Sequence, residues 1–138
     1  MSEADAGIVE YLQGHRIGVL ATTNRSGQPQ QTLIAYHFDG RDFAVSTRAP
    51  TLKARNIRRR PEVSLAVVDG PRQVIVYGSA RVIDDAAEVL RLHQQRIRQI
   101  ALREESDAEL AERLRREERV VLLLAPRRFY PPTLAQRP

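Results

Sequence analysis

Residues 45–57 join the end of a predicted strand to the start of a predicted helix. They read, in order, Val45, Ser46, Thr47, Arg48, Ala49, Pro50, Thr51, Leu52, Lys53, Ala54, Arg55, Asn56 and Ile57. Pro50 suits the first turn of a helix, and the first N–H groups of a helix have no partners within it. Three hydroxyl groups and three cationic side chains surround this helix start, which predicts an anion-binding site.

Each of these residues also has a structural interpretation. Ser46 or Thr51 can cap the helix, which is the commoner role of such residues. Asn56 can satisfy a backbone group, and Lys53 can be a solvated side chain. The sequence leaves these alternatives open beside the anion site.

The positive charge of the chain is concentrated in the same region. Residues 48–60 carry six basic residues and no acidic one, whereas the net charge of the whole chain is +5. Of the 22 basic residues, only Lys53 is a lysine, a compact point charge suited to a phosphate. This concentration favours an anionic partner, although a solvated helix end would have the same composition.

Length and composition limit the class of protein. A chain of 138 residues is expected to form one domain spanning residues 1–138. It has no cysteine, which excludes disulfides, iron–sulfur clusters and a cysteine nucleophile. No apolar run approaches the roughly 18 residues of a membrane helix, and the chain opens without a basic leader and apolar stretch. We therefore expect a cytoplasmic protein with no membrane partner.

Turn residues divide the chain into short β-prone runs and helical intervals. Strands are predicted over residues 16–22, 28–38, 42–47, 62–69, 72–84 and 120–125. Helices are predicted over residues 2–14, between Pro50 and Pro61, and over residues 86–102 and 106–118. Gly78 inside the fifth strand indicates a bulge or a close backbone approach, and residues 127–138, with three prolines, are predicted to be irregular. Six strands with hairpin links predict a mainly β, α+β fold: an antiparallel barrel with peripheral helices.

No motif for independent catalysis is present. The chain has no Gly-rich dinucleotide fingerprint, no phosphate loop and no nucleophile elbow. Its three histidines, at positions 15, 37 and 93, are far apart in sequence, so we predict no metal site. If the protein is an enzyme, a cofactor is expected to carry the reaction.

Residues 46–65 resemble a known family, and the matching residues are Ser46, Thr47, Thr51, Lys53, Asn56, Ile57, Arg60, Pro61, Val63, Ser64 and Leu65. Residues 18–29 resemble the first hairpin of that family, and residues 76–84 resemble its Gly-x-Ala strand. The family is the split β-barrel flavin and deazaflavin oxidoreductases. It includes the pyridoxamine 5'-phosphate oxidase-like FMN-binding proteins and the reductases of type B that use coenzyme F-420.

The resemblance implies a six-stranded split barrel that forms a homodimer with two cofactor sites at the interface. The implied cofactor site comprises Gln31, Thr32, Leu33 and Ile34 along the ring, Ser46, Thr47, Arg48, Thr51, Lys53, Arg55 and Asn56 around the phosphate, and the partner subunit's Tyr77 and Gly78. A dimer would also explain why several strands are apolar on both faces.

The charge count bears on which cofactor the resemblance implies. FMN ends in one phosphate, whereas F-420 adds a phospholactyl group and an oligoglutamate tail. Six basic residues exceed the need of one phosphate, and Arg55, Arg58 and Arg59 can meet the carboxylates of the tail. The resemblance then implies an F-420-dependent oxidoreductase that transfers a hydride to a small unsaturated or quinone-like organic substrate. The alternative is an FMN-binding pyridoxamine phosphate oxidase-like oxidoreductase.

Two questions stay open at this level. Tyr36 and His37 are candidate proton donors or substrate contacts, but interface packing of Tyr36 and exposure of His37 at a strand end are the favoured explanations. A non-enzymatic module that binds a cofactor or nucleic acid is a further alternative. Aromatic residues do not interleave with the arginines, which argues against nucleic acid.

Overall fold

The structure is a computed structural model that describes residues 5–97 and 104–134. Its elements are α1 (Ala6–Gln13), β1 (Ile17–Thr23), β2 (Pro29–Ala35), β3 (His37–Phe38), β4 (Phe43–Arg48), α2 (Leu52–Arg59), β5 (Glu62–Asp69), β6 (Arg72–Ile83), α3 (Ala86–Leu92), the π-helix η1 (His93–Ile97), α5 (Asp107–Arg116) and β7 (Arg119–Tyr130). The mainly β fold predicted from the sequence is confirmed.

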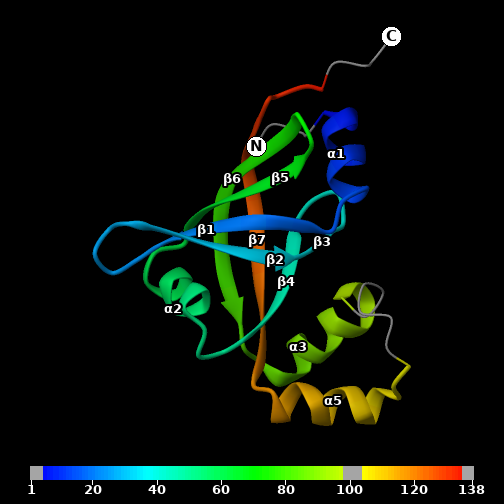
Figure 1. The fold of residues 1–138 in the computed structure, drawn as a ribbon. Helices are drawn as coiled ribbons and strands as arrows, with labels where there is room; N and C mark the ends of the chain where they lie inside the picture. Colours follow the sequence, from blue (N-terminus) through cyan, green and yellow to red (C-terminus); the bar gives the residue numbers. More distant parts are fainter. Residues whose placement is uncertain (1–4, 98–103, 135–138) are drawn as a thin grey trace.

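The strands form one curled antiparallel sheet (Figure 1). Their order is β2-β1-β5-β6-β7-β4-β3, and each neighbouring pair is antiparallel. The two strands at the ends of this order, β2 and β3, follow each other directly in the chain. The sheet therefore curls until its ends meet, which is the geometry of a split barrel.

The sheet has seven strands rather than the six predicted, because the long second strand is broken at Tyr36. Residues before Tyr36 pair with β1, and residues after it pair with β4. The Tyr36 side chain is buried and its hydroxyl donates to the carbonyl oxygen of Leu12, 2.7 Å away. This bond holds the chain at the point where it passes from one end of the sheet to the other.

Two hydrophobic cores hold the fold. The larger fills the curled sheet beneath α1 and α2, and it includes Ile8, Tyr36, Phe43, Ile57, Leu65, Val76 and Leu122. The smaller lies between the sheet and α3 and α5, and it comprises Ala44, Ile83, Val89, Leu92, Leu110, Leu114 and Val121. Each fully buried leucine or valine contributes about 1.5–3 kcal/mol, so both helical layers are firmly attached to the sheet.

The bulge predicted at Gly78 is confirmed, and it lies in the longest strand pair. Tyr77 pairs with Arg128 and Gly78 with Pro126, so Arg127 is the extra residue. A Cβ atom on Gly78 would lie 2.2 Å from the carbonyl oxygen of Ala125. Contrary to the predicted irregular tail, β7 continues to Tyr130, because residues 127–130 complete the pairing of the long strand β6.

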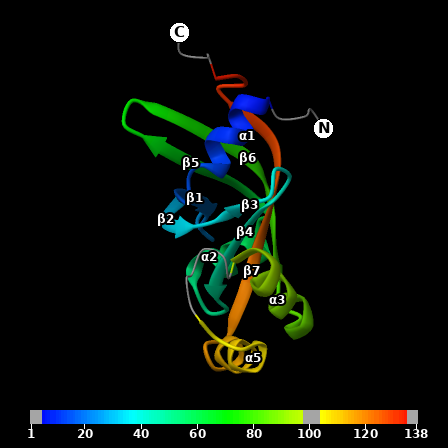
Figure 2. The ribbon, with the colours of Figure 1, turned by 90° about the vertical axis from the view of Figure 1, so that its right-hand side faces the viewer.

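Helices lie at the two ends of the sheet (Figures 1 and 2). In both views α5 is at the end opposite to the β5–β6 hairpin, with α3 beside it. Within the helix predicted over residues 86–102, the structure forms an α-helix to Leu92 and a π-helix over residues 93–97. Residues 98–102 of that prediction lie outside the described part. In the described ranges, none of the helices combines the length and apolarity needed to span a membrane.

The outer face of β2, β1, β5 and β6 is apolar. Alternation along these strands places Ile17, Val19, Ala21, Leu33, Ala35, Ala66, Val68, Ile75 and Tyr77 on the side away from the larger core. Leu33 is 69% exposed and Val68 is 58% exposed. A contiguous apolar sheet face of this kind is uncommon on a protein that stays monomeric.

Candidate functional site

A cavity of about 480 Å³ lies where β2, β4, α2, η1 and the start of β7 meet. We call it the main cavity. One part of its wall is apolar and the other is polar; the lining residues are Leu33, Ile34, Ala35, Ala44, Ser46, Thr47, Lys53, Ile97 and Arg119. None of these nine described residues is acidic. A flat apolar group with an anionic substituent matches this division.

Two cations face the main cavity. Lys53 is half-buried, and it forms no hydrogen bond or ion pair with any residue of the described ranges. Burial lowers the pKa of Lys53, and the charge of Arg119 lowers it further. The Nε atom of Arg119 donates to Glu117 at 2.9 Å, but Glu117 also accepts from Arg113. The charge of Lys53 is therefore left for an anion to balance.

Hydroxyl groups at the start of α2 complete this polar end. Thr51 occupies the N-cap position, but its side chain makes no bond to the first turn of α2. Instead, the Thr51 hydroxyl donates to the carbonyl oxygen of Arg48 at 2.9 Å and lies 3.3 Å from the Thr47 hydroxyl. The first N–H groups of α2 thus have no side-chain cap, and such groups attract anions.

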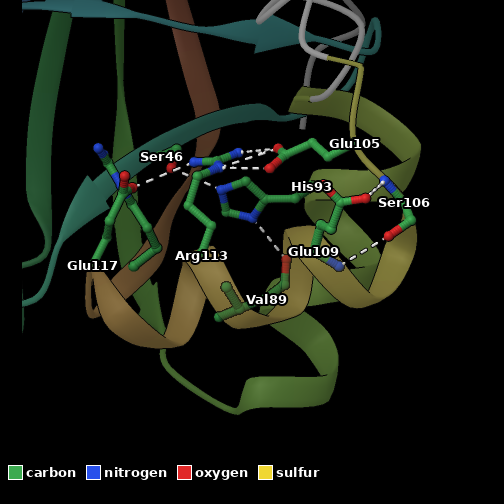
Figure 3. A network of polar contacts seen from close by, with 9 residues as sticks. Ser46, Val89, His93, Glu105, Ser106, Glu109, Arg113 and Glu117 are labelled. Carbon is green, nitrogen blue, oxygen red and sulfur yellow. Dashed lines mark hydrogen bonds and ion pairs between the residues drawn. The ribbon is translucent and has the colours of Figure 1, made fainter.

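Ser46 has a different partner from the two threonines. Its hydroxyl oxygen lies 2.8 Å from Nε2 of His93, which is buried on the far side of the cavity wall. Nδ1 of His93 lies 2.7 Å from the carbonyl oxygen of Val89. Figure 3 shows the imidazole ring between these two groups.

An ion-pair network surrounds His93 (Figure 3). Arg113 on α5 donates to Glu105 at 2.7 Å and to Glu117 at 3.3 Å. Burial lowers the pKa of His93, and the hydrogen bond to the Val89 carbonyl oxygen opposes this effect. The charges of Arg113 and Arg119 lower the pKa further, against a smaller opposing effect of Glu117. His93 is therefore held in the neutral form near neutral pH.

Arg96 fixes the π-helix over this region. It donates to the carbonyl oxygen of Asp42 at 2.6 Å and to that of His37 at 3.4 Å. It also pairs with Asp39 at 3.5 Å. These contacts tie η1 to the β3–β4 turn, and they position Ile97 in the cavity wall and His93 behind Ser46.

A second cavity, of about 570 Å³, lies on the other side of α2. It is lined by Asn24, Arg25, Ser26, Leu52, Arg55, Asn56 and Arg59. It combines Arg25 of the β1–β2 turn with Arg55 and Arg59 of α2, and we call it the arginine cavity. Neither Arg25 nor Arg55 is in an ion pair within the described residues, so a second anionic group can be balanced here.

Asn56 lines the arginine cavity, but its side-chain amide is bonded to neighbouring residues of the protein. The side chain is 1% exposed; its amide nitrogen donates to Thr22 Oγ1 and Asn24 Oδ1, each at 3.1 Å. Its oxygen accepts from Arg59 at 3.1 Å. The whole amide is used to hold the β1–β2 turn against α2.

The structure brings together most of the site residues predicted from the sequence. Leu33, Ile34, Ser46, Thr47 and Lys53 line the main cavity, Thr51 adjoins it, and Arg55 and Asn56 line the arginine cavity. Gln31, Thr32 and Arg48 line neither cavity. Tyr77 lies on the outer sheet face, where Cζ of Arg128 is 4.6 Å from the centroid of its ring. Gly78 packs against the backbone of β7.

The two candidate proton donors lie away from the main cavity. The Tyr36 hydroxyl is committed to Leu12 in the core, and burial raises its pKa. His37 accepts a hydrogen bond from Arg96 at 3.3 Å, and burial lowers its pKa, with Arg96 lowering it further. Neither residue is among those that line the cavity. The packing interpretation therefore describes Tyr36 better than the catalytic one.

Sequence reasoning missed Arg119 and His93. Arg119 reaches the cavity because it pairs with Arg48 across β4 and β7, which are 71 positions apart. His93 reaches Ser46 through the packing of α3 on the sheet. Neither residue belongs to a local motif. They could have been found only by knowing that β4 pairs with β7 and that α3 packs against these strands.

The donor set fits a phosphorylated cofactor with a flat ring. Lys53, Arg119 and the uncapped N–H groups at the start of α2 supply charge and donors suited to a phosphate. Apolar side chains from β2, β4 and η1 form the remaining wall. In the described part of the chain, no cluster of three or more potential metal ligands is present.

The comparisons with known proteins agree with this geometry. The chain is similar to the conserved hypothetical protein Rv2991 from Mycobacterium tuberculosis, with 27% identity over 94% of this chain and 82% of that one, and a TM-score of 0.70. It is similar to a protein named F420 reductase, with 25% identity over 87% of this chain and 93% of that one, and a TM-score of 0.65.

A third solved structure shares the fold. It is General Stress Protein 26 from Bacillus anthracis, with 18% identity, coverage of 89% of this chain and 88% of that one, and a TM-score of 0.63. Residues 4–131 match the family described as Pyridoxamine 5'-phosphate oxidase. With the curled sheet and the cation-lined cavity, this match over most of the chain shows that the protein belongs to the pyridoxamine 5'-phosphate oxidase family, whose members include flavin and deazaflavin oxidoreductases.

Proposed function

We propose that the protein is a coenzyme F-420-dependent oxidoreductase acting on a small unsaturated or quinone-like organic substrate. The observation that carries this proposal is the pair of cationic cavities on either side of α2. The main cavity offers Lys53 and Arg119 to one phosphate. The arginine cavity offers Arg25, Arg55 and Arg59 to further anionic groups.

The second cavity is what favours F-420 over FMN. FMN has a single phosphate, which the main cavity alone can balance. F-420 carries an additional chain of carboxylates, and the arginine cavity supplies guanidinium groups that bind carboxylates well. Arg58 is excluded from this role, since it pairs with Asp84 at 3.3 Å.

FMN binding is the second candidate. The family match and the size of the main cavity are equally compatible with FMN, because both cofactors have a flat tricyclic ring and a ribityl phosphate chain. An FMN-dependent oxidoreductase would use the main cavity in the same way and leave the arginine cavity to solvent.

In this proposal the side chains of the protein bind the cofactor and orient it. When bound, the cofactor would supply the hydride, and no carboxyl, thiol or imidazole group is among the described side chains that line the main cavity. Lys53 and Arg119 fix the phosphate, and Leu33, Ile34 and Ile97 exclude water from the ring. The proton that accompanies hydride transfer then comes from solvent or from the substrate side.

We also propose that two copies of the chain associate through the apolar outer face. Leu33 belongs both to that face and to the main cavity, so a second copy seated there would also close the cavity. The outer positions of β1 and β2 carry no charged side chain, so two such faces can pack together with little desolvation of charge. The predicted cytoplasmic location stays a prediction.

Titration of the purified protein with F-420, and separately with FMN, tests the cofactor by its fluorescence. We expect micromolar or tighter binding of F-420 and much weaker binding of FMN. The variant Lys53→Ala should lose about tenfold or more in affinity for either cofactor, because a charge-assisted hydrogen bond is lost. Arg41→Ala removes one exposed cation from the β3–β4 turn and serves as the matched control.

The arginine cavity is tested with Arg55→Ala. This variant should weaken F-420 binding and leave FMN binding unchanged, because only F-420 carries carboxylates beyond its phosphate. If the unmodified protein binds FMN more tightly than F-420, the protein is better described as an FMN-dependent oxidoreductase. Binding of neither cofactor would remove the basis for an oxidoreductase assignment.

A further inference from the structure

Ser46 is the one hydroxyl of the main cavity whose hydrogen the structure assigns to a buried group. The carbonyl oxygen of Val89 can only accept a hydrogen bond, so Nδ1 of His93 carries a hydrogen. In a neutral imidazole the other nitrogen, Nε2, is then an acceptor. The Ser46 hydroxyl, 2.8 Å away, therefore donates to Nε2.

This arrangement determines what Ser46 offers to a ligand. Once its hydrogen points to His93, the oxygen presents only lone pairs to the cavity. A phosphate or carboxylate oxygen opposite Ser46 would meet another acceptor and be repelled. An N–H or O–H group would instead be bound.

The acceptor lies beside apolar side chains of the cavity wall. Ser46 is on the same side of β4 as Ala44, facing α3 and the smaller core. Apolar Ala44 and Ile97 share the cavity wall with Ser46. A ring that lies against this part of the wall would therefore meet the acceptor.

We propose that Ser46, positioned by His93, accepts a hydrogen bond from the imide N–H that flavin and deazaflavin rings share, and takes no part in binding the phosphate. This inference rests on the proposed function of the main cavity. It corrects the sequence-based expectation that Ser46 donates to an anion together with Thr47 and Thr51.

Protonation of His93 would reverse the direction of the hydrogen bond between Ser46 and His93. An imidazolium donates from both nitrogens, so Ser46 would accept from Nε2 and turn its own hydrogen into the cavity. The charged groups that face His93 are Arg113 from α5, Glu117 at the C-cap of α5, Glu105 through its pair with Arg113, and Arg119 from β7. Burial first, and then the two arginines, disfavour the imidazolium, so the acceptor state is the one present near neutral pH.

The first test is made on the protein without cofactor. Nitrogen and carbon chemical shifts of the imidazole ring report which nitrogen carries the hydrogen. We expect the Nδ1–H form of His93 near neutral pH. The Nε2–H form would overturn the proposal, because Ser46 would then be free to donate. This measurement does not depend on whether F-420 or FMN binds.

The second test uses whichever of the two cofactors binds. Ser46→Ala should weaken binding about tenfold, and Ser46→Cys, whose thiol is a poor acceptor, should weaken it to a similar or smaller degree. Ser79→Ala removes a half-buried hydroxyl on β6 that lines neither cavity, and it is the matched control. Unchanged affinity of Ser46→Ala would overturn the proposal.

The pH dependence distinguishes acceptor from donor. Acidification through the titration of His93 should weaken binding more in the unmodified protein than in Ser46→Ala. The opposite difference would show that Ser46 donates to an anion, and would overturn the proposal. If neither cofactor binds the unmodified protein, the proposed function fails. The ring nitrogen of His93 that carries the hydrogen would still show whether the Ser46 hydroxyl donates to His93 or accepts from it.

Discussion

Lys53 on α2 and Arg119 on β7 line the same cavity, where burial and then the charge of Arg119 hold the pKa of Lys53 below its ordinary value. Two like charges facing a common space raise the free energy of the folded protein and lower that of a bound anion. The same feature that makes the site costly to fold makes it able to bind a phosphate.

Lys53→Met is therefore expected to stabilise the fold and weaken anion binding in the main cavity. The pKa of Lys53 is lower in the folded state than in the unfolded chain, so charged Lys53 destabilises the fold at every pH below the folded pKa. The gain is about 0.5 kcal/mol or less, since solvent screens a partly exposed charge. Thermal unfolding measures it, with and without inorganic phosphate. Phosphate should raise the melting temperature of the unmodified protein more than that of Lys53→Met, and equal shifts in both proteins would contradict this expectation.

Asn56→Ala should destabilise the protein by about 2–3 kcal/mol. The substitution removes three hydrogen bonds, at about 0.5–1.5 kcal/mol each, and leaves Thr22 with a weaker set of partners. Urea unfolding gives the free energy directly. Arg59→Ala removes one of those bonds and a second one to the Thr23 carbonyl oxygen, both from an exposed side chain, so it should cost less. A loss below about 0.5 kcal/mol for Asn56→Ala would show that the β1–β2 turn is not held by this amide.

His93 should make the stability pH-dependent. Its pKa is lowered in the folded state, so the unfolded chain binds the proton more tightly between the folded pKa and about 6.5. His93 thus contributes stability above about pH 6.5 that is lost as the pH falls through its folded pKa. Urea unfolding at a series of pH values should show a steeper loss for the unmodified protein than for His93→Gln. Parallel curves would mean that His93 titrates alike in both states.

The fold was predictable because its signals are local. Residues 46–65 carry a strand end, a turn, a helix and the next strand in sequence, and Gly78 marks its bulge by being a glycine inside a strand. The phosphate end of the site was predictable for the same reason, since Thr47, Thr51 and Lys53 lie on one short segment. These residues are adjacent before any folding occurs.

The rest of the site depends on pairing between distant segments. Arg119 enters through the β4–β7 register, and His93 enters through the packing of α3 against β4. Tyr36 could not be placed from its neighbours, because its partner Leu12 lies on α1. Hydrogen-bond polarity at Ser46 was also beyond the sequence, since it depends on which nitrogen of a distant histidine meets the Val89 carbonyl.

Val68→Glu should separate the proposed dimer into monomers. Val68 lies on the apolar outer face and is 58% exposed in the single chain. In a symmetric dimer the substitution would bury two carboxylates without partners, which costs several kcal/mol. Sedimentation measures the association, and Ala108→Glu on the exposed side of α5 is the matched control. An unmodified protein that is already monomeric at high concentration would contradict the proposed dimer.

Gly78→Ala should destabilise the fold more than Gly70→Ala, although both replace a strand or turn glycine by the same methyl group. At Gly78 the new Cβ would lie 2.2 Å from the carbonyl oxygen of Ala125, so β6 and β7 must move apart at the centre of the sheet. At Gly70 nothing lies within 4 Å of the new atom, and only the left-handed backbone, with φ of 56°, is unfavourable. We expect a cost of about 1 kcal/mol at Gly70 and of about 3 kcal/mol or more at Gly78. Urea unfolding of both variants decides the matter, because equal costs would mean that the two strands can separate at the bulge without loss of packing.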